Sequence, residues 1–277
     1  MDIYTAQYGY TGDDRLDITV KGNDTFGANF APTWEMVNGF KNHTMSEDEY
    51  TWRYRALMNQ HWNESNSPFM ELAKGIVFPG GVTVVCFCKP GAFCHRILFV
   101  ESMEKLGMIY RGERNFRNEP DTSTSGDLLS VQYGIICHQV NCQGVMGAGI
   151  AKAIADKWPR VKEYYVALCK KTFENGVPVP HLGTAYPVAI SKNLYVANLF
   201  GQDRYGRDKR YTNYGMLRKA MLQLRQWRNA HEDLLDIHLP IYFPYRMGCS
   251  NAGGDWYLVR SMIRDIFPDA NILRKGG

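Results

Sequence analysis

The sequence predicts an α/β fold with two domains, and three observations support this expectation. Apolar, β-branched runs of strand length alternate with amphipathic helical patterns along the chain. The length of 277 residues suggests two domains at roughly 150 residues each. Residues 111–126 are polar and lack apolar periodicity, as linkers do. We therefore expect a smaller α/β domain over residues 1–112, a linker over 113–125 and a second domain over 126–277.

The composition narrows the class of protein. The chain is 45% hydrophobic, which allows a sizeable core. Its net charge of +4 is too small to indicate nucleic-acid binding, although anionic small molecules remain open as ligands. The first residues form no apolar signal segment, and no apolar run approaches the roughly 18 residues of a membrane span. The cysteines number seven, and an odd number favours reduced thiols over a disulfide framework. We therefore expect a cytoplasmic protein with no membrane partner.

In the first domain, the pattern predicts two helices and a strand. Ser46 and Glu49 form a capping box at the start of a helix that runs to His61. Residues 82–88 form a short apolar run typical of a buried strand. Residues 92–106 follow as a helix that Gly107 closes.

The second domain alternates strands and helices more regularly. This alternation predicts a mostly parallel sheet covered by helices on both faces, with ligands bound beyond the carboxyl ends of the strands. The predicted strands span residues 133–140, 185–190, 194–200, 237–243 and 271–273. The predicted helices span residues 149–158, 161–171, 214–230 and 255–266.

Two glycine-rich loops follow predicted strands of the second domain. The first, residues 141–151, carries Gly144, Gly147 and Gly149 directly before a helix, and this pattern suits a phosphate held by free helix N–H groups. A tight turn without a ligand explains the same spacing, whereas a Rossmann fingerprint and a P-loop both fit poorly. The second loop, residues 244–256, leads into a helix. There the simpler role of an acidic residue is to stabilise the helix dipole.

The two loops together resemble those of macro domains. The stretch from His138 to Cys142, followed by residues 144–151, is similar to the ribose and phosphate loop of the branch that includes the ADP-ribose 1″-phosphate phosphatases. The second loop is similar to the second phosphate loop of that family. The resemblance spans about residues 126–273. It implies a macro-type three-layer α/β/α sandwich with a mixed, mostly parallel sheet, and a site for ADP-ribose.

The resemblance also implies roles for individual residues. Asp127 matches an acid that accepts a hydrogen bond from the adenine amino group, and Asn141 matches an asparagine at the distal ribose. His138 and Asp255 become candidate catalytic partners, with Asp255 orienting or activating water and His138 moving a proton to the leaving group. A satisfied core histidine is the other interpretation of His138. The expected ligand-binding residues are Asp127, Leu128, Asn141, Gly144, Gly147, Ala148, Gly149, Ile150, Gly248, Cys249, Ser250, Asn251, Ala252 and Gly253.

Two features depart from the macro-domain pattern. No apolar strand precedes Gly126, where the residues EPDTSTS stand instead. Gln202 occupies the position of a lysine that forms a covalent intermediate in some relatives, which argues against a lysine-adduct mechanism. The charged run 203–207 beside it is expected to be a solvated loop rather than part of the site.

The first domain contains a group of chemically versatile side chains with no assigned role. Cys86 and Cys88 share one face of the predicted strand, and Cys94, His95 and Arg96 open the next helix. Buried structural cysteines, a low-pKa thiolate at the helix N-terminus and a zinc site all remain open. We assign no metal and no cofactor from the sequence alone.

Three hypotheses about function follow. The first is a hydrolase that acts on ADP-ribose 1″-phosphate or removes ADP-ribose from a modified protein or nucleic acid. The second is a module that binds ADP-ribose or a related nucleotide without turnover. In the third, the N-terminal domain carries the catalysis and the macro-like domain recruits its substrate. Residues 82–106 of that N-terminal domain resemble a family of unknown function, numbered 488 among such domains, which is thought to be α/β and nucleotide-handling.

Overall fold

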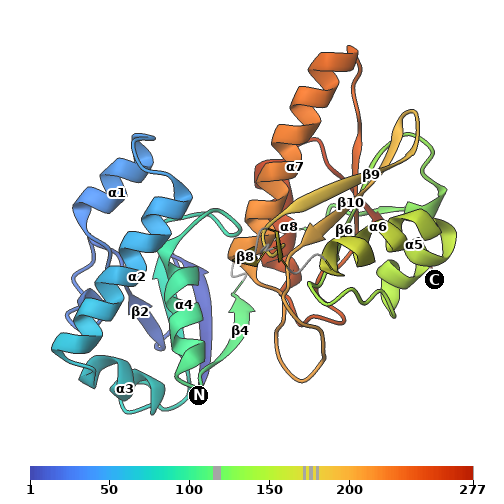
Figure 1. Ribbon diagram of the computed structural model, residues 1–277. Helices are drawn as coiled ribbons and strands as arrows, with labels where there is room; N and C mark the ends of the chain where they lie inside the picture. The colour runs from blue at the N-terminus through green and yellow to red at the C-terminus, as the bar shows by residue number, and fades with distance from the viewer. Residues whose placement is uncertain (115–119, 171–172, 175–176, 179–180, 277) are drawn as a thin grey trace. The chain divides into compact units, whose positions relative to one another are not determined.

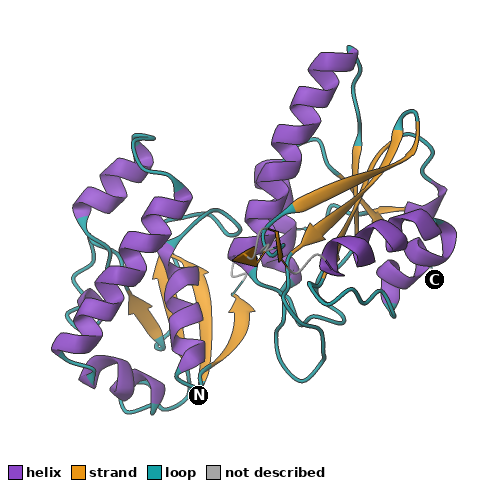
Figure 2. Cartoon of the chain, viewed as in Figure 1, coloured by secondary structure: helices purple, strands orange, loops and turns teal. Residues whose placement is uncertain are grey.

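The computed structural model describes residues 1–114, 120–170, 173–174, 177–178 and 181–276. The chain divides into two compact units, Met1–Glu119 and Pro120–Gly277. Figure 1 colours the elements of both units in chain order, and Figure 2 shows that each unit combines helices with a sheet. None of the described helices is long and apolar enough to cross a membrane.

The first unit is built on a parallel four-stranded sheet of described residues, with the order β2-β3-β1-β4. β3, which the sequence predicts, is buried along its whole length. It ends at Cys86 rather than Cys88, because the chain leaves the sheet there for a turn in which Gly91 has a φ of +75°. The strands are β1 (Asp2–Gln7), β2 (Arg15–Asp17), β3 (Val82–Cys86) and β4 (Ile109–Glu113).

Both predicted helices of the first unit form. The Ser46 Oγ accepts a hydrogen bond from the Glu49 N–H at 3.1 Å, as the capping box predicts. The helix expected from residue 92 begins only at His95, because Cys94 has extended backbone geometry and serves as the N-cap residue. The helices are η1 (Gly27–Phe30), α1 (Trp34–Lys41), α2 (Glu47–Glu64), α3 (Ser67–Ala73) and α4 (His95–Lys105).

The second unit contains a six-stranded sheet with the order β5-β12-β11-β6-β10-β9 in its described part. Neighbouring strands are parallel except β9 and β10, so the sheet is mixed and mostly parallel, as predicted. Its strands are β5 (Thr124–Ser125), β6 (Gly134–Val140), β9 (Ala185–Ser191), β10 (Leu194–Phe200), β11 (Ile241–Pro244) and β12 (Asn271–Arg274). A separate antiparallel pair consists of β7 (Phe173–Glu174) and β8 (Val177–Pro178).

Helices cover both faces of this larger sheet. Because side chains alternate along a strand, Tyr195 and Val196 of β10 point to opposite faces. Val196 belongs to the core shared with α5 and α6, whereas Tyr195 packs edge-to-face on Trp227 of α7 with ring centroids 5.2 Å apart. The unit is therefore a three-layer α/β/α sandwich (Figure 1). Its helices are η2 (Leu128–Ser130), α5 (Gly149–Lys157), α6 (Pro159–Lys170), α7 (Tyr214–Leu235) and α8 (Trp256–Ile266).

Some predicted boundaries in the second unit shift. α6 begins at Pro159, because proline suits the first turn of a helix, where its missing N–H is not needed. α7 continues to Leu235 and is closed by Asp236 with a φ of +50°. The longer helix delays β11, which begins at Ile241 and not at residue 237. Lys171, predicted as the end of α6, lies outside the described residues.

The predicted linker over residues 113–125 is wrong at both of its ends. Glu113 is the last residue of β4, while Thr124 and Ser125 form β5 and pair with β12. A short strand, β5, therefore precedes Gly126, although no apolar strand is evident there from the sequence. Two polar residues at a sheet edge carry no hydrophobic alternation, so the pattern could not show them. Residues 115–119 lie outside the described part of the chain.

Gly134, at the start of β6, provides a test of the close strand pairing. Its φ is +108°, and a Cβ atom there would lie 2.2 Å from the main-chain oxygen of Pro240. We expect Gly134→Ala to lower the free energy of unfolding by about 3 kcal/mol, through backbone strain and overpacking together. Gly126→Ala is the matched control, because its Cβ would meet no atom closer than 3.4 Å. Equal urea midpoints for the two variants would contradict the expectation.

Candidate functional site

A cavity of about 540 Å³ lies where three loops of the second unit meet. The loops follow β6, β10 and β11, whose carboxyl ends share one edge of the sheet because β10 and β11 both run parallel to β6. Ligands of α/β proteins bind at such edges. The expected binding residues that line the cavity are Asn141, Gly147, Ala148, Gly149, Ile150, Gly248, Ser250, Asn251 and Ala252.

Asn141 fixes the shape of the first loop. Its Oδ1 accepts hydrogen bonds from the N–H groups of Gln143 (2.9 Å) and Val145 (3.3 Å). Its Nδ2 donates to the Val145 carbonyl oxygen at 2.8 Å, and the Tyr165 hydroxyl lies 2.8 Å from Oδ1. Most of the hydrogen-bonding capacity of the Asn141 side chain is therefore used within the loop. Asn141 shapes the cavity wall whether or not it also reaches a ligand.

The amino end of α5 opens on the cavity. Its N-cap residue, Ala148, has no side chain that can accept from the first helical N–H groups. The N-cap residues of α7 and α8, Asn213 and Asp255, both supply such a side-chain acceptor. Since Ala148, Gly149 and Ile150 line the cavity, the uncapped N–H groups and the helix dipole favour an anion at this point.

The second loop is held tightly by its glycines. Gly248 and Gly253 have φ values of +72° and +65°, and a Cβ at Gly253 would lie 3.1 Å from the Cα of Arg210. The Gly248 carbonyl oxygen accepts hydrogen bonds from the Gly254 N–H at 2.9 Å and from the Thr212 hydroxyl at 2.7 Å. These contacts join the loop after β11 to the loop after β10.

The loop after β10 contributes to the cavity wall, although residues 203–205 and 207 are exposed, as the sequence predicts for a solvated loop. Tyr205, Gly206 and Arg207 line the cavity. The Arg207 guanidinium donates hydrogen bonds of 2.7 and 3.1 Å to the Asn251 Oδ1, which brings a positive charge to the second loop. The predicted parallel sheet could have indicated these three residues, because the loop that follows any strand parallel to β6 lies at the same edge of the sheet.

His138 lies in the protein core. It is fully buried, and its Nε2 lies 2.7 Å from the Oδ1 of Asn198, its register partner on β10. Burial lowers the pKa of His138 to about 4, against the opposing effect of the bond to Asn198. Among the described residues, the cavity lining includes the neighbouring Gln139 and the strand's last residue, Val140, but not His138. His138 is therefore a core residue whose Nδ1 has no hydrogen-bond partner among the described residues, and its catalytic role stays a prediction.

Asp255 serves as the cap of α8. Its Oδ1 accepts from the Tyr257 N–H at 2.7 Å, and its own N–H donates to the Tyr214 hydroxyl at 2.8 Å. This is the simpler of the two roles that the sequence left open. In the described part of the chain, the cavity lining does not include Asp255 or the following expected binding residues: Asp127, Leu128, Gly144, Cys249 and Gly253.

Two of these residues have other identifiable environments. The Asp127 Oδ1 accepts a hydrogen bond from the Leu129 N–H at 3.0 Å and caps η2. Burial raises the pKa of the Cys249 thiol to about 12, so this thiol stays protonated near neutral pH. Neither residue contributes a charge to the cavity in this arrangement.

Comparison with known proteins gives a family match for the first unit. Residues 13–107 match the family model DUF488-N3a, described as the active DUF488-N3 subclade. The match runs from before β2 to just after α4. The resemblance to the family numbered 488 is therefore confirmed, and it extends well beyond residues 82–106.

The chain is also similar to one curated protein and to solved macrodomain structures. It is 33% identical over 97 residues to an ADP-ribose 1″-phosphate phosphatase of Meyerozyma guilliermondii, covering 30% of this chain and 54% of that protein. The chain thus spans about half the length of this relative. A protein of unknown function from Bacteroides thetaiotaomicron is 25% identical, with 55% of this chain and 95% of that chain covered and a TM-score of 0.46. The macrodomain of Mycobacterium tuberculosis DarG is 22% identical, with coverage of 56% and 97% and a TM-score of 0.43.

The buried His138 makes stability depend on pH. Its pKa is about 4 in the folded chain and 6.5 ordinarily, so between these values the unfolded chain binds a proton that the folded chain does not. Proton uptake by the unfolded chain therefore destabilises the fold. This loss of stability is absent above the ordinary pKa and grows as the pH falls toward the folded pKa, to about 3 kcal/mol in total. We expect His138→Gln to lose less stability than the native chain between about pH 7 and about pH 4.5 in urea unfolding.

His43→Asn, at an exposed position, is the control for this measurement. Asparagine suits the φ of +58° that His43 adopts, so the control should fold normally and keep the native pH dependence. Parallel stability profiles for the native chain and His138→Gln would show that the buried imidazole does not have the lowered pKa.

Proposed function

We propose that the second unit binds ADP-ribose or a close derivative in the cavity between its three loops. The observation that carries the proposal is the uncapped amino end of α5 at the wall of a cavity of about 540 Å³. Helix N-termini of this kind bind phosphate groups, and the volume lies within the range of small-molecule sites. The similarity to a protein named ADP-ribose 1″-phosphate phosphatase supports ADP-ribose as the ligand class.

Other lining residues suit the remaining parts of such a ligand. Arg207 supplies a cation for a diphosphate, and the rings of Tyr205 and Tyr245 offer surfaces for a base. The Oε1 of Gln139 is buried and has no hydrogen-bond partner among the described residues. A ribose hydroxyl is the kind of donor that would satisfy this oxygen.

Hydrolysis is the second candidate function, acting on ADP-ribose 1″-phosphate or removing ADP-ribose from a modified protein or nucleic acid. The similarity to the phosphatase favours it. The described lining, however, contains arginine, tyrosine, serine and amide side chains but no carboxylate and no imidazole. Turnover would therefore rest on charge stabilisation by main-chain N–H groups and arginine. Binding without turnover is the function that the geometry supports best.

Replacing Ala148 with aspartate tests whether the amino end of α5 binds a phosphate group of the ligand. Ala148→Asp would give α5 the side-chain cap that it lacks, and we expect it to raise stability by about 1 kcal/mol. The same carboxylate would occupy the N–H groups and repel phosphate, so affinity for ADP-ribose should fall at least tenfold, which is about 1.4 kcal/mol. Thermal unfolding and calorimetric titration of the full chain measure the two effects.

Ala148→Ser is the matched control, because it caps the helix without adding charge. It should weaken ADP-ribose binding less than Ala148→Asp does. Unchanged affinity in the aspartate variant would contradict the placement of the phosphate at α5, and no binding by the folded native chain would remove the proposal.

Arg207 offers a second test of the ligand position. We expect Arg207→Gln to weaken ADP-ribose binding roughly tenfold, through loss of a charge-assisted contact to the diphosphate. Arg204→Gln is the control, because its side chain is exposed on the same loop and is not among the described residues that line the cavity. Equal affinities of the two variants would place the diphosphate elsewhere.

Phosphate release from ADP-ribose 1″-phosphate distinguishes the two candidate functions. From the cavity lining, we expect the native chain to bind this compound and to release less than one phosphate per chain over an hour. Repeated turnover that Arg207→Gln abolishes would establish hydrolysis in this cavity instead. Turnover that persists in Arg207→Gln and Ala148→Asp would locate the chemistry outside it.

A further inference from the structure

Three cysteines of the first unit converge on one point. The Sγ atoms of Cys86, Cys88 and Cys94 all lie within 4.8 Å of one another, and those of Cys86 and Cys88 are 3.7 Å apart. Cys86 and Cys94 are buried, while Cys88 is partly exposed. A tetrahedral zinc ion with bonds of about 2.3 Å holds its sulfur ligands about 3.8 Å apart. The observed spacing therefore needs only small side-chain movements to surround such an ion.

His95 presents a ring nitrogen atom to one of these thiols, that of Cys86. Its ring is buried, and its Nδ1 lies 3.9 Å from the Cys86 Sγ. Its Nε2 lies 3.0 Å from the main-chain oxygen of Ile18. Because a carbonyl oxygen can only accept, the Nε2 atom donates in this contact, and Nδ1 is the ring nitrogen on the thiol side. Zinc-binding histidines are held in this way by a hydrogen bond from the second ring nitrogen.

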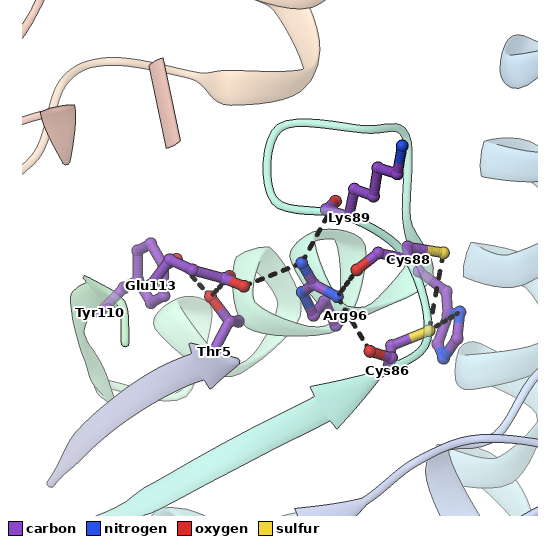
Figure 3. Close-up of polar contacts among 8 residues, drawn as sticks. Thr5, Cys86, Cys88, Lys89, Arg96, Tyr110 and Glu113 are labelled. Atoms are coloured by element: carbon purple, nitrogen blue, oxygen red, sulfur yellow. Dashed lines mark hydrogen bonds and ion pairs between the residues drawn. The ribbon is translucent and has the colours of Figure 1, made fainter. Parts of the chain in front are cut away.

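A buried ion pair holds the chain segment that carries two of the cysteines. Arg96 donates hydrogen bonds to the main-chain oxygens of Cys86 (3.4 Å) and Cys88 (2.9 Å). It also pairs with the Glu113 Oε1 at 3.0 Å, and the other carboxylate oxygen accepts from the Thr5 hydroxyl at 2.5 Å (Figure 3). The Arg96 and Glu113 side chains are 1% and 0% exposed. This network positions the two cysteines independently of any ion.

We propose that Cys86, Cys88, Cys94 and His95 form a zinc site that stabilises the first unit. Binding of Zn²⁺ releases three protons, one from each thiol, while the imidazole binds as the neutral species. Three thiolates and one imidazole fill all four positions of a tetrahedral ion, as structural zinc sites do. The proposal does not depend on ADP-ribose binding by the second unit.

Packed thiols without an ion are the competing interpretation. Thiol groups are weak hydrogen-bond donors, and burial alone gives no reason for three of them to meet at one point. It gives no reason either for a histidine ring nitrogen to lie beside the Cys86 thiol. The two interpretations differ in a measurable quantity, the stoichiometric affinity for a thiophilic divalent ion.

The test is cobalt and zinc titration of the full chain, purified under reducing conditions and stripped with a chelator. We expect one equivalent of Co²⁺ to bind, with thiolate-to-cobalt charge-transfer bands and the visible bands of a tetrahedral ion. One equivalent of Zn²⁺ should abolish these bands and raise the temperature of unfolding. A folded chain that shows neither stoichiometric binding nor a zinc-dependent rise in unfolding temperature would overturn the proposal.

Matched cysteine variants assign the site. Cys88→Ser, at the least buried of the three positions, should weaken Co²⁺ binding at least roughly 100-fold and remove the stabilisation by zinc. Cys169→Ser, a partly exposed thiol of the second unit, is the control and should bind like the native chain. His95→Asn should shift the visible bands, because an oxygen or water would replace the nitrogen. Native-like cobalt spectra in both Cys88→Ser and His95→Asn would refute this ligand set, and unchanged ADP-ribose binding throughout would separate it from the function of the second unit.

Discussion

The parallel alignment of β6 with both of its neighbours is the constraint on which the second unit depends. β6 pairs along its whole length with β10, and β11 lies on its other side. Since the three strands run in one direction, the loops that follow them end at the same edge, and the cavity is the space among those loops. The opposite end of β6 shows how tightly the strands approach, because Gly134 leaves no room for a side chain beside the main chain of Pro240.

The two-residue period of β6 and the position of a residue along the strand together decide which side chains can reach the cavity. His138 joins the core shared with α5 and α6, while Gln139 points to the other face and lines the cavity. β6 is almost entirely buried, so its hydrophobicity does not reveal which face a given residue occupies. For this reason the sequence predicts the strand and its following loop, but it cannot choose between His138 and Gln139.

Elements with a strong local signal were predictable, and those that depend on sheet order were not. β10 occupies the predicted residues 194–200, and both glycine-rich loops lie at the cavity as expected. The loop with Arg207 was missed because its charged residues look like any solvated loop, and its position follows only from the place of β10 beside β6. β5 was missed for a related reason, since two polar residues become a strand only through pairing with β12.

The first unit shows how three consecutive residues can serve three different partners. Successive side chains on a helix diverge by about 100°, so residues at its start reach separate surroundings. Cys94, the N-cap residue of α4, approaches the other two thiols. The Nε2 of His95 contacts the main chain of Ile18 while its Nδ1 lies beside the Cys86 thiol, and Arg96 turns to the ends of β3 and β4. Burying a guanidinium and a carboxylate costs free energy that simple packing would not require. That cost is understandable where the pair fixes the geometry of a site, and Arg96 holds the carbonyl oxygens of both Cys86 and Cys88.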